Sequence, residues 1–240
     1  MEAPTSHTAS RGVVLGGVAY GDRSRIVKVL TQAEGLVPLW VANARQHKAL
    51  WHPMAAIELA GLRPGRGQGL WQFQECRRFQ PQLKLASSPA RAAVAFFIAE
   101  VLSATLEEQA PAPEVFGLAW DMIQALEQAE EVGWIHMGFM SRLVQTLGMM
   151  PSDPGHPGMW LSLENGEFVT AEEAPQAAMS PAVSHALMTI HGMEFAQVGN
   201  LKLDKQQRKE LVLGAYQYIQ RQLGRTRELK SYDVLETLFS

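Results

Sequence analysis

The sequence predicts an α+β protein in which a small N-terminal β-barrel is followed by an all-helical C-terminal domain with a short β-hairpin inserted in it. Up to about residue 80, short apolar runs rich in β-branched residues alternate with glycine and proline, a pattern typical of strands joined by tight turns. After residue 81, apolar residues recur at the spacing of helices. We therefore expect one domain over residues 1–80 and a second over residues 81–240.

Five strands are expected in the first domain, at residues 12–20, 25–31, 36–42, 54–62 and 70–79. The last two flank the segment from Arg63 to Gly69, whose proline and three glycines predict a hairpin connection. Five short strands within about 70 residues match a five-stranded Greek-key barrel of the OB type. A small SH3-like barrel is the alternative.

Helices are expected in the second domain at residues 89–106, 114–129, 134–147, 181–190, 204–223 and 229–239. Ser87 or Ser88 can cap the first of these, and Pro89 suits its first turn. Residues 151–157 are rich in proline and glycine, and residues 160–169 resemble a hairpin with Asn165-Gly166 at its turn. We therefore expect the hairpin insertion at about residues 151–170.

The composition narrows the class of protein. A chain of 240 residues with 47% hydrophobic residues can bury a sizeable core. The sequence contains no run of eighteen apolar residues and begins with a polar segment, so we expect no membrane span, no signal peptide and a cytoplasmic location. Cys76 is the only cysteine, which excludes an intrachain disulfide and leaves no thiolate cluster for zinc. We expect neither a metal nor a cofactor.

Charge is distributed unevenly along the chain. The net charge is −3, but residues 1–80 contain ten Lys and Arg against five Asp and Glu, whereas residues 81–201 contain three against fourteen. Residues 202–240 are basic again, with eight against five. A basic barrel in an acidic protein indicates a local surface for a polyanion such as nucleic acid. Chance clustering of solvated charges is the alternative.

The motifs give no support to an enzyme. The glycines between Gly65 and Gly69 lack the GxxxxGK[ST] pattern and lie between two strands, so they predict a turn and not a phosphate-binding loop. No nucleophile elbow is present. The seven histidines are scattered, and Asp153 with His156 supplies only two possible metal ligands. An enzyme therefore ranks last among the candidate functions.

Several short motifs follow one another in a characteristic order: the segment Val14 to Leu30, Thr31-x-x-x-Gly35, Asn43-Ala-Arg45, His52-Pro53, Phe97-Ile-Ala-Glu100-Val-Leu102, Leu147-Gly148, and Leu229-Lys-Ser231-x-x-Val-Leu235. In their order and spacing they resemble the bacterial RecO DNA repair proteins over nearly the whole chain. The resemblance implies an OB-fold N-terminal domain and a helical C-terminal domain. It also implies DNA binding, strand annealing, and work with RecR and single-stranded DNA-binding protein in loading RecA.

The sequence departs from the family pattern at three places. It lacks the four-cysteine zinc site that many relatives carry, and Pro151 to Trp160 stand there instead. Asn43-Ala44 replaces the usual Gly-Ala, and Lys48 is the only cation soon after Arg45, where relatives are often richer in Lys and Arg. The missing cysteines argue against a metal site, and the other two departures bear on DNA binding.

A mediator must hold DNA of any sequence, which requires phosphate contacts and sequence-independent stacking. We expect these DNA contacts from Arg23, Arg25, Arg45 and Lys48, with Arg11, Lys28, Arg66 and Arg77 as lesser candidates. Among the aromatic rings, Trp40 and Phe73 are expected inside the barrel. Trp51 lies in a polar stretch and is expected at the surface. Single- and double-stranded DNA are both candidate partners.

The resemblance also implies a pocket in the helical domain for the acidic C-terminal tail of single-stranded DNA-binding protein. An apolar lining beside cations would suit such a peptide. The candidate cations are Arg142, Lys205, Arg208 and Lys209, and a solvated helix face is the alternative explanation for them. The alternative function for the whole chain is a structural adaptor, whose helical domain docks a partner while the barrel binds no DNA.

Overall fold

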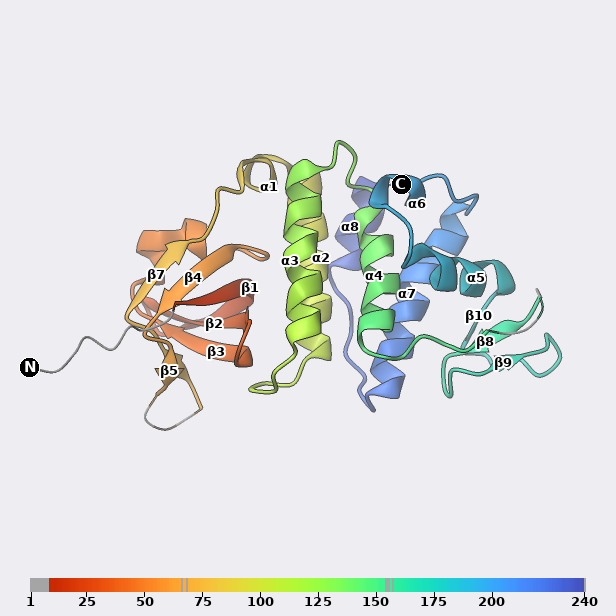
Figure 1. The fold of residues 1–240 in the computed structure, drawn as a ribbon, viewed down its shortest axis with the longest axis horizontal. Helices are drawn as coiled ribbons and strands as arrows, with labels where there is room; N and C mark the ends of the chain where they lie inside the picture. The colour runs from red at the N-terminus through yellow and green to blue at the C-terminus, as the bar shows by residue number, and fades with distance from the viewer. Residues whose placement is uncertain (1–8, 66, 68, 154–155, 157, 240) are drawn as a thin grey trace, which may run out of the picture. The chain divides into compact units, whose positions relative to one another are not determined.

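The computed structural model describes residues 9–65, 67, 69–153, 156 and 158–239. The chain divides into two compact units, one ending at Glu127 and the other beginning at Gln128 (Figure 1). The first contains a curled sheet and three helices, and the second contains the remaining helices and a small sheet. The predicted fold class, α+β with an N-terminal barrel and a helical C-terminal part, is confirmed.

The sheet of the first unit has the strand order β5-β6-β3-β2-β1-β4-β7. Its strands are β1 (Ser10–Tyr20), β2 (Ser24–Thr31), β3 (Gly35–Val41), β4 (Ala56–Ala60), β5 (Arg63–Pro64), β6 (Trp71–Gln72) and β7 (Glu75–Arg78). β6 and β7 are two pieces of the predicted fifth strand. β6 pairs with β3 through Leu39 and Trp71, and β7 pairs with β4 from Ile57 to Ala60. One stretch of chain therefore bridges the two sides of the curled sheet, as in an OB barrel.

A bulge in β1 lets this strand pair with both of its neighbours. The first residues of β1 pair with β4, from Ser10 to Val13, while the residues from Gly12 to Tyr20 pair with β2. The register with β2 shifts between Val14 and Gly16, and Gly16 has a φ of 132°, which side chains strongly disfavour. Such a bulge bends a strand and increases its twist, so the sheet can curl around its core.

The interior of the barrel is made by the inward side chains of all the long strands. The core includes Val14, Val27, Val29, Val37, Leu39, Ile57, Leu59 and Trp71. β-branched residues dominate this set, because their stiff side chains pack well on a pleated surface.

Three helices complete the first unit: α1 (Leu83–Ser87), α2 (Pro89–Thr105) and α3 (Pro113–Gln128), whose last residue begins the second unit. Ser88 caps α2, as expected, by accepting a hydrogen bond from the Arg91 N–H. The loop between α2 and α3 binds the edge of β3, where the Gln109 N–H donates to the Leu36 carbonyl at 2.8 Å. These helices therefore belong to the same compact unit as the barrel, which extends to Glu127. The division into functional domains at residues 80 and 81 stays a prediction.

Gln82 joins the barrel to the helices. Its side chain is fully buried, accepts a hydrogen bond from the Ala56 N–H at 2.9 Å, and donates one to the Met54 carbonyl at 2.8 Å. Glu127 acts in a similar way at the other end of this region, because its carboxylate accepts from the N–H groups of Lys84 and Leu85 at the start of α1. Both side chains satisfy backbone groups that would otherwise lack partners.

The second unit is built on α4 (Ile135–Thr146), α5 (Pro181–Ile190), α6 (Phe195–Val198), α7 (Lys205–Gln222) and α8 (Tyr232–Leu238). α4 packs against α5, α6 and α7. Asp204 and Gln207 form a capping box at the start of α7, which explains where this helix begins. None of the helices among the described residues is long and apolar enough to cross a membrane.

The predicted hairpin insertion is confirmed. β8 (Trp160–Ser162) pairs with β9 (Phe168–Val169), and Gly166 at the turn has a φ of 74°. A third strand, β10 (Ala178–Met179), which the sequence did not predict, pairs with the other edge of β8.

The role of Gln82 can be tested by replacing it with leucine, which keeps the volume and removes both hydrogen bonds. We expect Gln82→Leu to lower the free energy of unfolding by about 2–4 kcal/mol, because two buried backbone groups lose their partners. Urea denaturation measures this. Gln32→Leu, at an exposed turn residue, is the matched control and should change stability by less than about 0.5 kcal/mol. Equal stability of the two variants would contradict this role for Gln82.

Candidate functional site

Two of the four strongest DNA-binding candidates lie at the start of β2, and the other two lie on a short helix whose first residue is hydrogen-bonded to the turn there. Arg23 is exposed in the turn between β1 and β2, and Arg25 begins the paired part of β2. The Ala44 N–H donates to the Arg23 carbonyl at 3.2 Å, which brings the short helix η1 (Ala44–Leu50) to this turn. η1 carries Lys48, which is exposed. The backbone of Arg45 also lies in η1, but its side chain is outside the described residues.

These cations differ in how freely they can reach a ligand. Arg25 is half-buried, and its Nη2 donates to the Gly17 carbonyl at 2.8 Å, which holds the guanidinium against β1. Neither Arg23 nor Lys48 forms an ion pair with any residue that the structure describes. Arg23 and Lys48 are therefore the candidates best placed to contact phosphate.

The lesser candidates lie elsewhere on the barrel and most have partners. Lys28, in the middle of β2, forms an ion pair with Glu108 at 3.0 Å. Arg77 pairs with Glu58 at 2.9 Å, and this hydrogen-bonded carboxylate raises the pKa of Arg77. Arg11, at the opposite end of β1 from the turn, lies 4.6 Å from the centre of the Phe79 ring and 5.8 Å from that of Trp120. Arg66 lies outside the described residues.

The expectations for the aromatic rings were wrong for two tryptophans. Trp51 is buried, with 7% of its surface exposed, and its ring packs 6.0 Å from that of Phe73 in the barrel core. The polar stretch that contains Trp51 folds as η1, which the sequence did not predict, and this turn directs the ring inward. Trp40 was expected inside but is 38% exposed. It lies between the buried Leu39 and Val41, so strand alternation turns it outward.

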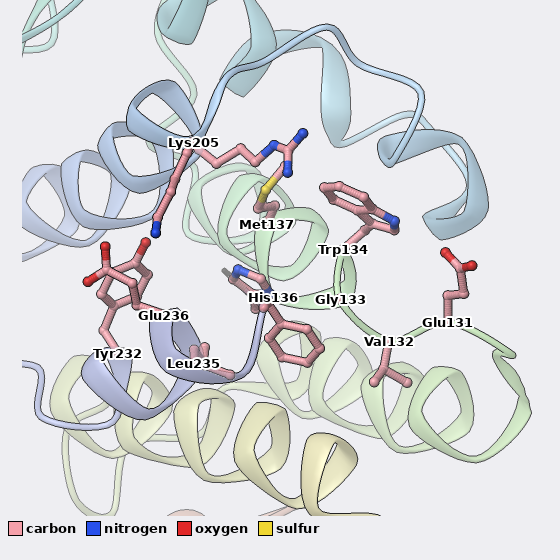
Figure 2. Close-up of a pocket in the computed structure, with 12 residues that line it drawn as sticks. Glu131, Val132, Gly133, Trp134, His136, Met137, Lys205, Tyr232, Leu235 and Glu236 are labelled. Atoms are coloured by element: carbon pink, nitrogen blue, oxygen red, sulfur yellow. The ribbon is translucent and has the colours of Figure 1, made fainter.

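The second unit contains a pocket of about 410 Å³ between the start of α4, α7 and α8. Figure 2 shows Trp134, His136 and Met137 on one side, with Leu235 and Glu236 on another. Phe239 also lines the pocket, and its ring stacks on that of His136 with the centroids 6.1 Å apart. The pocket is therefore largely apolar. No sequence motif marks these residues as a site. Only the helical spacing of apolar residues in the segments 134–147 and 229–239 indicated that some of them face inward.

Two of the four cations expected for a partner peptide line this pocket. Lys205 is exposed at its rim, and Arg208 lies with its guanidinium 4.7 Å from the centre of the Trp134 ring. Lys209 forms an ion pair with Glu236 at 3.0 Å. Arg142 donates to the Met193 carbonyl at 2.6 Å and stacks 3.9 Å from the Phe195 ring. Neither Lys209 nor Arg142 is among the described residues that line the pocket.

The pocket has neutral titratable groups in its interior and charged groups at its rim. Burial lowers the pKa of His136 to about 4, so this imidazole is neutral at pH 7. Burial, with a smaller effect of Glu236, raises the pKa of Tyr232 to about 12. The ion pair with Lys209 compensates Glu236, while Glu131 is exposed. The buried His136 and Tyr232 are thus neutral, Lys205 and Arg208 supply positive charge, and the exposed Glu131 supplies a negative charge.

The described residues offer little to a metal ion or a thiol reaction. Among them, no three His, Cys, Asp or Glu side chains come together as a metal site would require. Cys76 is half-buried, and burial raises the pKa of its thiol to about 12, so it is protonated at pH 7. The structure therefore offers two candidate sites. One is the group of exposed cations on the barrel of the first unit, and the other is the apolar pocket with Lys205 and Arg208 in the second unit. The class of protein is one with an N-terminal OB-type barrel and a helical C-terminal part.

Known proteins identify this class further. Residues 6–81 match the family model "Recombination protein O N terminal", and residues 86–152 match "Recombination protein O C terminal". The chain is 27% identical to the DNA repair protein RecO of Bacteroides fragilis over 237 residues, which cover 95% of this chain and 97% of that protein. It is 24% identical to the protein of the same name from Azobacteroides pseudotrichonymphae, covering 96% and 98%. The relative from Phocaeicola vulgatus is 26% identical, covering 95% and 98%.

The chain belongs to the RecO family. Membership of this family supports a role in DNA repair and recombination.

Proposed function

We propose that this chain is a non-catalytic recombination mediator that binds single- and double-stranded DNA through its barrel. In this proposal it anneals strands and, with RecR and single-stranded DNA-binding protein, assists the loading of RecA on the nucleoid in the cytoplasm. The observation that carries the proposal is that Arg23, in the turn before β2, and Lys48, in η1, are exposed and have no ion pair among the described residues. The proposal requires no cofactor.

Phosphate contacts meet the needs of a mediator, because the strand to be annealed can have any sequence. Cations without an acidic partner bind phosphate and release the counterions of the DNA, so the affinity falls steeply as salt rises. Arg25 and Arg45 lie in the same region, and we propose that they add to the same contact surface. Lys28 and Arg77 would first have to leave their carboxylate partners.

We further propose that the pocket of the second unit binds the acidic C-terminal tail of single-stranded DNA-binding protein. Apolar tail residues would enter between Trp134 and Phe239, and the acidic ones would meet Lys205 and Arg208 at the rim. Arg142 and Lys209 are not among the described residues that line this pocket, and their contribution to peptide binding stays a prediction.

DNA binding can be tested by removing the two exposed cations. For Arg23→Ala with Lys48→Ala, we expect weaker binding of a labelled oligo-dT strand and a salt dependence, d(log K)/d(log [salt]), that is shallower by about 1.4, since two phosphate contacts are lost. Fluorescence anisotropy at several salt concentrations measures both quantities.

Lys84→Ala with Lys202→Ala is the matched control, because it removes two exposed cations outside the proposed surface. The control should keep the affinity and the salt dependence of the unchanged protein. If the unchanged protein binds no DNA at low salt, the mediator proposal fails and the structural adaptor is favoured. An equal effect of both double variants would move the DNA site away from the turn and η1.

The peptide pocket can be tested with a labelled peptide of several aspartates ending in Leu-Phe. Lys205→Glu should lower its affinity by about fivefold or more, because a cation at the rim becomes an anion. The matched control is Lys202→Glu, an exposed residue near α7 that is not among the described residues lining the pocket. Isothermal titration calorimetry measures both. If the two variants bind the peptide equally, the acidic ligand does not occupy this pocket.

A further inference from the structure

The outward face of β1, β2 and β3 carries an apolar row that nothing in the barrel requires. Val18 pairs with Ile26, and Ile26 pairs with Trp40, so these three side chains stand side by side on one face of the sheet. Tyr20 lies on the same face, two residues beyond Val18. Val18 is 65% exposed, Tyr20 47% and Trp40 38%, although the sheet interior is already filled by residues such as Val27 and Leu39.

We propose that this face, the Tyr20–Trp40 platform, stacks the bases of single-stranded DNA and makes the barrel prefer single strands to duplex. The inference rests on the proposed DNA binding and specifies which form of DNA the barrel selects. The cations Arg23 and Lys48 cannot supply this preference, because phosphate contacts attract both single strands and duplex. The rings can supply it, because they contact bases.

The spacing of the two rings favours an unpaired strand. Tyr20 and Trp40 lie on strands that are two apart, and strand geometry places them roughly 12 Å from one another. Bases in a duplex are stacked about 3.4 Å apart and present no free face. An extended single strand can instead present separated bases to separate rings, and every base has a face that can stack.

The cations near the platform favour a polyanion as its ligand. Arg23 follows Tyr20 after two residues, in a turn that also carries the exposed Asp22. Ala44, the first residue of η1, is hydrogen-bonded to this turn, and Lys48 is exposed near the other end of η1. At the other side of the platform, Lys28 lies on the same face of β2 as Ile26 but is paired with Glu108. A strand laid across the face therefore meets Arg23 at the turn, Lys48 on η1, and mainly rings in the middle of the sheet. Several apolar side chains exposed side by side indicate a binding surface, whereas a single exposed one does not.

The rings and the cations contribute to binding in different ways. Lys28, the cation beside the rings, is paired with Glu108, so the rings are expected to contribute by stacking and not by charge. Because stacking involves no counterions, loss of the rings should weaken binding without changing its salt dependence. Loss of Arg23 and Lys48 should change the salt dependence. The platform and the two cations can thus be tested independently.

The test compares Tyr20→Ala with Trp40→Ala in one chain against Phe96→Ala, which removes an exposed ring on α2. Anisotropy is measured with an oligo-dT strand and with a blunt duplex of the same length. We expect the double variant to bind oligo-dT about 30-fold more weakly, with the duplex affinity changed less than threefold and the salt dependence kept. Tyr20→Phe with Trp40→Phe should restore most of the lost affinity, because the stacking faces return.

Three outcomes would overturn the platform. The double variant could bind oligo-dT as well as Phe96→Ala does, its affinities for strand and duplex could fall in parallel, or the phenylalanine variant could fail to restore binding while it folds normally by circular dichroism. Failure of the proposed function is a different result, because the unchanged protein would then bind neither DNA at low salt.

Discussion

The first unit depends on the pairing of β1 with two neighbours across a bulge. Ser10 to Val13 pair with β4 while Gly12 to Tyr20 pair with β2, and Gly16 makes the change of direction possible. The bend helps the sheet to curl far enough for one stretch of chain to reach both of its sides. This stretch, from Trp71 to Arg78, pairs with β3 at one end and with β4 at the other. The curl places valines and leucines inside, and Val18 and Tyr20 on β1 and Trp40 on β3 are exposed on the outward face.

The two proposed sites, on the barrel and in the pocket of the second unit, both combine apolar side chains with cations at their border. On the barrel, apolar rings are bordered by Arg23 and Lys48, so a polyanion with stackable bases suits the surface. In the second unit, an apolar pocket has Lys205 and Arg208 at its rim, so a short acidic peptide with apolar side chains suits it. In both proposals the cations are ones that form no ion pair with a described residue, whereas Lys28, Arg77 and Lys209 are paired. The two proposals thus assign two anionic ligands to a protein whose net charge is negative.

The sequence predicted the regular elements well, because their signals are local. Alternation gave the barrel strands, Ser88 with Pro89 marked the start of α2, and Asn165-Gly166 marked the hairpin turn. The exposure of single rings was not predictable. Leu36 to Val41 are apolar at every position, so alternation could not show that Trp40 faces outward, and η1, which turns Trp51 into the core, has no strong sequence signal. The pocket also depends on contacts between Trp134 and residues about a hundred positions away, which no local pattern records.

The central claim is that the barrel holds single-stranded DNA across β1, β2, β3 and η1. Photo-cross-linking of the full chain to an oligo-dT strand that contains 5-iodo-deoxyuridine tests it most directly, with the linked peptides identified by mass spectrometry. The account predicts cross-links in residues 18–26 and 38–51, with Tyr20 and Trp40 among the linked side chains. Cross-links confined to residues 128–240, or to the α2 and α3 helices, would contradict it.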